Sequence, residues 1–301
     1  MIRVVLTSIR SALILLFLIQ GIGCGTIGSL YRTVMPGDED GLKKRVWVIP
    51  FHDQAGVGEK KMAQITADLE GFLEKTGRFL VKKGIETTPS SQIILTSQSA
   101  FILSPTLIKS AEEMGINVLV VGALRPFEAD TRREGIWPLR KTKRKVDISV
   151  LVNAVDVIDS SFLLSHLETI DKEYSSSGDG EERKATLKGT TLDEALSEIL
   201  ENQAEKIAKE LRAHPWRGTV TSVDSGGLLV NGGRDIGLEN GSVFEVYGIE
   251  GSIRSFDGRV FPFLGDKVGE IEVVKVLDSS VEATPLTGGP FEAGQVVQLK
   301  H

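Results

Sequence analysis

The residues from Val146 to Ile170 constrain the fold most, because they contain the longest strand-like pattern in the chain. The apolar residues of the first run recur at every second position: Val146, Ile148, Val150, Val152 and Ala154. This period of two is typical of a strand with one buried face. A second run, Phe162 to Ile170, follows the polar break Asp159-Ser160-Ser161. The two runs therefore predict an antiparallel hairpin at the centre of the fold.

The start of the chain has the layout of an export signal. Arg3 and Arg10 precede an apolar stretch from Ala12 to Ile19, and small residues follow it. Gly21-Ile22-Gly23-Cys24 resembles the lipobox of bacterial lipoproteins, with Gly21 where that motif usually has Leu. The resemblance implies a signal peptide over residues 1–23 and a lipid on Cys24.

A second interpretation of this start stays open. Residues 11–30 carry no charge, and a stretch of that length can act as an uncleaved membrane anchor. Its glycines make it a poor membrane helix by propensity. Both interpretations place the rest of the chain outside the cytoplasm.

Length and charge limit the classes of partner. The 301 residues suit about two domains. The formal net charge is −6, and it becomes −8 without Arg3 and Arg10, which argues against nucleic acid as a partner. Because Cys24 is the only cysteine, the chain can form no internal disulfide, and the fold must rest on its core.

After a tether over residues 24–43, residues 44–214 predict an α/β domain. Strands are expected at Arg45–Ile49, Phe79–Lys82 and Ile116–Val121, and helices at Glu59–Thr76 and after the cap Ser104-Pro105. A polar loop is expected at Asp130–Arg140 and a mobile polar excursion at Lys172–Lys188. Thr191 and Glu194 predict a capping box for a last helix, which His214-Pro215 ends.

Residues 216–301 predict a separate, compact all-β barrel, because glycine is frequent there and no helical stripe is visible. Its strands are expected at Gly218–Val223, Gly227–Val230, Ser242–Tyr247, Val268–Leu277, Ser280–Pro285 and Gln295–Leu299.

The order of these elements resembles a known group. Val46-Trp47-Val48-Ile49-Pro50-Phe51, Thr76-Gly77-Arg78-Phe79, Val118-Leu119-Val120-Val121-Gly122 and the turn Val155-Asp156-Val157 look like the domain shared by the curli secretion protein CsgG, the amino-terminal part of TolB and the middle part of FlgT. Arg217-Gly218-Thr219-Val220 and residues 235–241 and 293–297 are similar to the SH3-like carboxy-terminal module of FlgT. The resemblance implies a three-layer-type α/β (α+β) domain with a central antiparallel hairpin, followed by a small SH3-like barrel.

Patterns for catalysis or metal binding are missing from the sequence. His52, His166, His214 and His301 have no second histidine or cysteine at metal-ligand spacing, and His166 is expected on the outward face of its strand. Residues 56–61 resemble a phosphate loop only loosely, and there is no G-x-S-x-G motif. The sequence therefore predicts no catalytic residue, no metal and no cofactor.

One basic run predicts a contact surface, either for anionic lipid or for a protein: Arg140, Lys141, Lys143, Arg144 and Lys145. A solvated loop is the simpler alternative.

Together these observations predict a non-enzymatic, periplasm-facing lipoprotein of the outer membrane. The resemblance implies a scaffold or assembly subunit most like a FlgT-type component of the flagellar basal body, with envelope proteins as partners and a homo-oligomeric ring as one form of assembly. The main alternative is a subunit of a CsgG-type secretion channel or another envelope regulator. In that family two inserted hairpins cross the membrane, and residues 130–140 and 172–188, at the corresponding places, are too charged for that purpose.

Overall fold

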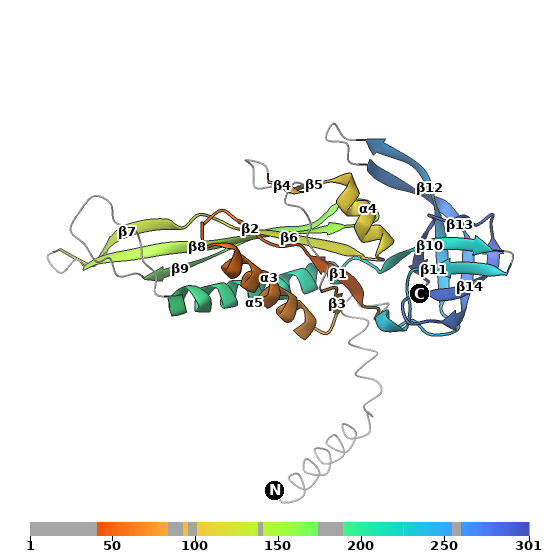
Figure 1. The fold of residues 1–301 in the computed structure, drawn as a ribbon, viewed down its shortest axis with the longest axis horizontal. Coiled ribbons are helices and arrows are strands. Elements are labelled where there is room, and N and C mark those ends of the chain that lie inside the picture. The colour runs from red at the N-terminus through yellow and green to blue at the C-terminus, as the bar shows by residue number, and fades with distance from the viewer. Residues whose placement is uncertain are drawn as a thin grey trace, which may run out of the picture. The chain divides into compact units, whose positions relative to one another are not determined.

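The computed structural model describes residues 41–83, 93–95, 101–137, 141–173, 189–224, 226–254 and 260–300. Residues 41–301 form one compact unit. It combines a mixed α/β sheet with a closed barrel, as the sequence predicts (Figure 1). Cys24 and Arg140 lie outside the described residues.

A seven-stranded mixed sheet forms the first half of this unit. The strand order is β3-β1-β6-β8-β7, with β2 paired to β6 and β9 paired to β8. The bounds are β1 Lys44–Val48, β2 His52–Asp53, β3 Phe79–Val81, β6 Val118–Leu124, β7 Glu128–Glu134, β8 Lys141–Asp156 and β9 Phe162–Glu173. β1 runs parallel to β3 and β6, and β8 runs antiparallel to β6, β7 and β9.

The predicted central hairpin is confirmed as β8 and β9, but β8 is buried differently along its length. Near Val146 and Ile148 only alternate side chains are buried, as predicted. From Val150 to Asp156 every residue is buried, because this part of β8 pairs with β6 and has an apolar cluster on each face. The expectation of a single buried face therefore holds only for the first half of the strand.

Helices α3 (Glu59–Lys75) and α5 (Gly189–Arg212) cover one face of the sheet, packing Leu69, Leu73, Ile199 and Ile207 against the alternate residues of β1, β6 and β8. Helix α4 (Pro105–Glu113) and strand β5 (Phe101–Leu103), which pairs with β4 (Ile93–Leu95), contribute to the core on the other face. Ser104 caps α4 by accepting from the Leu107 N–H through its Oγ at 3.2 Å, as predicted.

Three expectations about segments of the α/β domain are wrong. Residues 128–134 form strand β7, paired to β8 along its whole length, although the sequence there has no apolar alternation and a loop was predicted from Asp130 to Arg140. Helix α5 begins at Gly189, so Thr191 lies inside its first turn and is not its cap. Strand β9 also continues to Glu173, three residues beyond the predicted end, and residues 174–188 of the predicted excursion lie outside the described residues.

Six strands close the barrel in the order β10-β11-β14-β13-β12-β15, and each corresponds to a predicted strand. Their bounds are β10 Arg217–Asp224, β11 Gly227–Val230, β12 Val243–Arg254, β13 Val260–Val276, β14 Val281–Gly288 and β15 Val296–Leu299. Trp216, which is 1% exposed, and Phe244 lie in its core with ring centroids 5.9 Å apart. The narrower resemblance to SH3-like modules stays a prediction.

Candidate functional site

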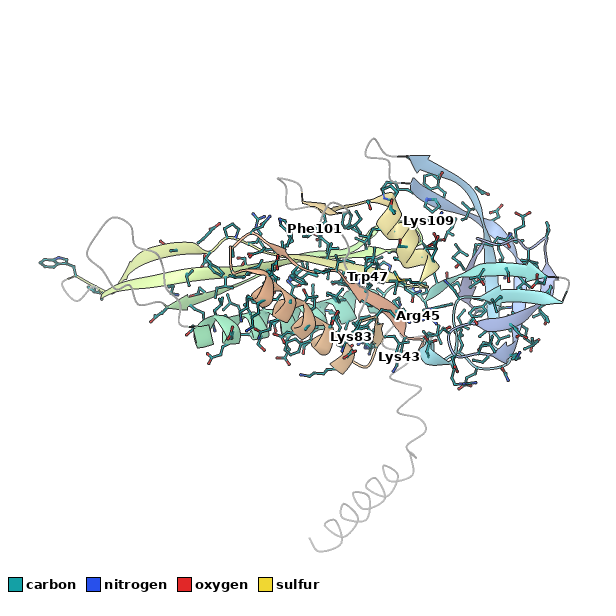
Figure 2. All side chains as sticks on the ribbon, in the orientation of Figure 1. Lys43, Arg45, Trp47, Lys83, Phe101 and Lys109 are labelled. Carbon is teal, nitrogen blue, oxygen red and sulfur yellow. The ribbon has the colours of Figure 1, made fainter. Side chains whose placement is uncertain are left out.

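A buried arginine joins the sheet to the barrel. Arg45 on β1 is 3% exposed and donates through Nε and Nη2 to the two carboxylate oxygens of Asp235, at 2.9 and 2.8 Å. Its Nη1 donates to the carbonyl of Asn231 at 2.5 Å, and its Nη2 also donates to the carbonyl of Ser279 at 2.9 Å. Figure 2 shows Arg45 among the side chains at this junction. One cation thus satisfies acceptors from three segments of the barrel.

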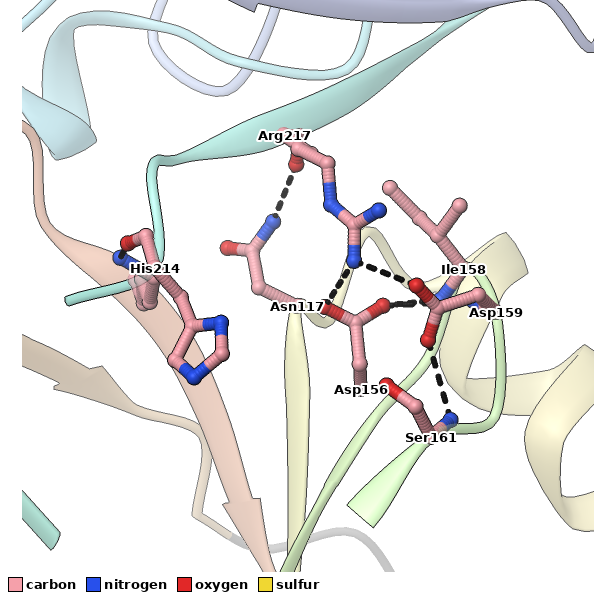
Figure 3. A network of polar contacts seen from close by, with 8 residues as sticks. Asn117, Asp156, Ile158, Asp159, Ser161, His214 and Arg217 are labelled. Atoms are coloured by element: carbon pink, nitrogen blue, oxygen red, sulfur yellow. Dashed lines mark hydrogen bonds and ion pairs between the residues drawn. The ribbon is translucent and has the colours of Figure 1, made fainter. Parts of the chain in front are cut away.

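A second ionic group lies at the start of the barrel (Figure 3). The Arg217 guanidinium donates to two carboxylates at 2.8 Å each. One belongs to Asp156, the last residue of β8, and the other to Asp159 in the turn that follows. Asn117 donates to the Arg217 carbonyl at 2.8 Å and accepts from the Arg45 backbone N–H at 2.8 Å. Desolvation acts to raise the pKa of the Asp159 carboxyl, but Ser161 and Arg217 outweigh it and hold this pKa below its ordinary value.

A pocket with a volume of about 710 Å³ lies beside α3. Its walls come from the end of β1, the following loop, α3, β5 and β6, and they include Phe51, His52, Met62, Thr66, Glu70 and Phe101. The Phe51 ring lies directly against Gly122, where a Cβ atom would come within 2.2 Å of the ring. The volume and apolar lining are typical of small-molecule sites.

Residues 56–61, which loosely resemble a phosphate loop in sequence, contribute backbone N–H groups that bind the Asp53 carboxylate. The Asp53 carboxylate accepts backbone N–H bonds from Ala55, Gly56 and Val57 at 3.1, 2.7 and 3.2 Å, and from Gly58 at 2.8 Å. Desolvation acts to raise the pKa of Asp53, but these four donors outweigh it and lower the pKa. Because the Asp53 carboxylate already accepts from these four N–H groups, they are not available to a phosphate.

The histidines do not form a site among the described residues. His52 lines the pocket, and the carbonyl of His214 accepts from Lys44 Nζ at 2.7 Å, while His301 lies outside the described residues. The outward position predicted for His166 is wrong, because its Nδ1 lies 3.2 Å from Oε1 of Gln203 on α5. Across the described ranges, no group of three or more His, Cys, Asp or Glu side chains could hold a metal ion.

The predicted basic run lies largely on strand β8. Lys141, Lys143 and Arg144 pair through their backbones with β7, and Lys145 Nζ forms an ion pair with Asp171 at 2.6 Å. The turn before this run carries two highly exposed apolar residues, Ile136 at 85% and Trp137 at 79%. In the sequence, these two apolar residues lie in the segment Asp130–Arg140, which predicts a loop but not an exposed apolar turn.

A second ribbon extends beyond the barrel. Strands β12 and β13 pair over residues 247–254 and 260–267, and we call these residues the distal ribbon. Four of its large apolar side chains are exposed: Ile249 (48%), Ile253 (58%), Phe263 (49%) and Leu264 (38%). The sequence did not predict this extension, since the two expected strands cover only Ser242–Tyr247 and Val268–Leu277. Among the described helices, none is long and apolar enough to span a membrane.

Comparisons with known proteins add limited information. No protein-family model matches the sequence, and no curated protein matches it. Solved structures with some likeness include the PelC dodecamer from Paraburkholderia phytofirmans, with 13% identity over 57% of this chain and 90% of that one at a TM-score of 0.33. TolB from Acinetobacter baumannii is 12% identical over 83% of this chain and 49% of that one, with a TM-score of 0.31. A minor lipoprotein from A. baumannii is 10% identical over 56% and 93%, with a TM-score of 0.27. Likeness at these scores supports no argument about function.

Proposed function

We propose that the protein is a non-enzymatic lipoprotein of the bacterial envelope that acts as a subunit of an envelope assembly. The observation that carries this proposal is the distal ribbon. Four large apolar side chains exposed together on one hairpin are typical of a surface that another protein covers. The barrel would therefore contact a neighbouring protein through this ribbon.

The junction at Arg45 supports an assembly role as well. An arginine buried to 3% exposure and bonded to both oxygens of Asp235 holds the barrel against β1 in one orientation. A scaffold needs such fixed geometry between its binding surfaces, because a partner on the barrel and a partner on the α/β domain are then held at a constant separation.

The sequence supplies the finer part of the proposal. The lipobox-like residues 21–24 support an anchor at Cys24, and Gly25 supports an outer-membrane location, because the usual retention signal in that family is Asp at this place. The resemblance to FlgT and CsgG supports a flagellar or other envelope structure as the assembly, with self-association through the α/β domain. A CsgG-type secretion channel is the second candidate.

The decisive experiment changes the distal ribbon. If the ribbon contacts a neighbouring protein, chemical cross-linking in native membranes should capture a complex of the native chain with that protein. Ile253→Ser and Phe263→Ser together should abolish this complex. Leu286→Ser is the matched control, because Leu286 is 50% exposed on β14 but outside the ribbon. Complexes that persist in the double variant would contradict the proposed contact.

A cellular test separates the two candidates. Deletion of the gene should remove an envelope structure visible in cell tomograms if the protein is a scaffold. Ion conductance by the purified protein in planar bilayers would instead support the channel. Charge reversal at Arg140, Lys141 and Arg144 then tests whether the basic run contributes to the assembly.

A further inference from the structure

The two-stranded ribbon formed by β7 and the start of β8 has a free-standing end. Residues 141–144 of β8 pair with β7, and the pairing of β8 with β9 begins only at Lys145 and Glu173. Glu128, Ala129 and Asp130 of β7 are exposed. We call residues 128–137 and 141–147 the basic ribbon, and Figure 1 shows it at the end of the sheet away from the barrel.

The turn of the basic ribbon exposes its apolar side chains to water. Ile136 and Trp137 are 85% and 79% exposed, which are the highest values among the large apolar residues described. The other two tryptophans are buried, Trp47 at 5% and Trp216 at 1%. Tryptophan has an apolar body and one polar N–H group, and it is enriched where a membrane meets water.

Charge at this end of the ribbon has the opposite sign to that of the whole chain. Residues 131–137 and 141–144 contain five basic residues and one acidic residue, whereas the net charge of the chain is −6. Arg132 is paired with Lys143 in the strand register, so the two strands bring basic residues of both to the same end of the ribbon. At the base of the ribbon the sign reverses, since Glu128 lies opposite Asp147.

The size of the apolar tip favours a bilayer over a protein as the occupant. Two large side chains can bury at most roughly 400 Å² between them, about half of the ~800 Å² that each partner contributes to a standard protein interface. A bilayer needs no such area, because apolar insertion and charge attraction to anionic lipids act together.

We propose that the tip of the basic ribbon docks on the surface of an anionic phospholipid bilayer. Ile136 and Trp137 enter the headgroup region, and the net positive charge of the two strands beside them is attracted to the lipid phosphates. Together with a lipid on Cys24, this contact would hold the chain to a membrane at a second place. The proposal does not depend on the role of the distal ribbon.

Trp137 provides a direct probe, because the other two tryptophans are buried. A chain of residues 25–301 contains every described residue and lacks the leader and the lipid. Adding vesicles of phosphatidylcholine and phosphatidylglycerol should shift its fluorescence to shorter wavelength and protect it from acrylamide. Vesicles of phosphatidylcholine alone, or high salt, should not. Trp137→Phe should remove the shift and keep vesicle binding.

Substitutions then measure the two contributions. Ile136→Ser with Trp137→Ser should weaken partitioning onto anionic vesicles by on the order of tenfold or more, since both side chains lose apolar burial. Lys143→Gln and Arg144→Gln should each weaken it about fivefold. Matched controls are Phe263→Ser for the apolar change and Lys109→Gln, at an exposed helical position, for the charge. Both controls should bind like the native chain.

Four results would overturn the proposal. The first is no binding of the chain to anionic vesicles. The second is binding without a fluorescence shift, which would show that the tip stays in water. The third is loss of binding in Phe263→Ser but not in the tip variant, which would assign the contact to the distal ribbon. A cross-link from position 137 to a protein, without vesicle binding, would make the surface a protein contact instead.

Discussion

Arg45 and Asp235 form a bidentate ion pair between strand β1 and the barrel, although 190 residues separate them in the chain. The Arg45 side chain is 3% exposed and that of Asp235 is 28% exposed. Removing one partner of such a pair leaves the other charge and several carbonyl acceptors without a donor, which is much more costly than losing a surface ion pair.

Arg45→Ala is therefore expected to lower the free energy of unfolding by about 3 kcal/mol. Urea unfolding followed by circular dichroism measures it. Lys109→Ala is the control, because its ion pair with Glu113 is 4.0 Å long and solvent-exposed, and we expect it to cost at most about 0.5 kcal/mol. An Arg45→Ala protein as stable as the control would show that the junction contributes little.

The barrel is predicted to fold without the α/β domain. Residues 216–301 contain all six strands of the closed barrel and the packed pair Trp216 and Phe244. This fragment should be soluble, rich in β structure and unfold cooperatively, and mild proteolysis of the whole chain should cut near His214-Pro215. A fragment that is unfolded on its own would place the domain boundary elsewhere.

The sequence predicted elements whose signals are local. Helices α3 and α4 carry apolar stripes, the glycines that end them and, for α4, the cap Ser104, so each was predicted close to its observed bounds. The barrel strands were predicted for the same reason, since glycine and aspartate turns separate them. Strand β7 was missed because its sequence, Glu128–Glu134, has no apolar alternation, and the strand is held by pairing with β8.

The contacts of the candidate sites depend on partners distant in sequence. Arg45 resembles any charged residue at the start of a strand, and only the folded chain brings Asp235 to it. Gln203 on α5 is fully buried and donates to the backbone carbonyls of Val150 and His166, which no helical pattern predicts. The basic run was visible in the sequence, but the exposed Trp137 beside it became significant only through its place at the turn.

Asp53 should make stability depend on pH. Its pKa is lowered in the folded chain, so the ionised carboxylate stabilises the fold at neutral pH. This contribution is lost as the pH falls from the ordinary carboxyl pKa through the lower folded-state pKa. Asp53→Ala is expected to cost about 2 kcal/mol at pH 7. The difference from the native chain should shrink in urea titrations as the pH approaches 3. An equal difference at both pH values would exclude the charge as the cause.

Cys24 is predicted to be the lipid attachment point. Intact-mass measurement of the native protein should show the loss of residues 1–23 and the added mass of the lipid. Cys24→Ser should prevent processing and release the chain from membranes, while Ser29→Ala, also in this segment, should change neither. Retention of residues 1–23 would instead support the uncleaved anchor over residues 11–30.

Gly122 is expected to be required for the packing of the Phe51 ring beside α3. A Cβ atom on Gly122 would lie 2.2 to 2.7 Å from three atoms of the Phe51 ring, so the ring would have to move. Phe51 is itself 5% exposed and packs in the core with α3, which limits that movement. Gly122→Ala should therefore lower the free energy of unfolding by about 2 kcal/mol through overpacking.

Phe51→Leu in the same chain should recover part of this loss, because the smaller side chain leaves room for the methyl group. Gly71→Ala is the control, since nothing lies within 4 Å of its added Cβ atom in helix α3, and it should be neutral or stabilising. If Phe51→Leu and Gly122→Ala destabilise the chain additively, the two side chains do not compete for the same space.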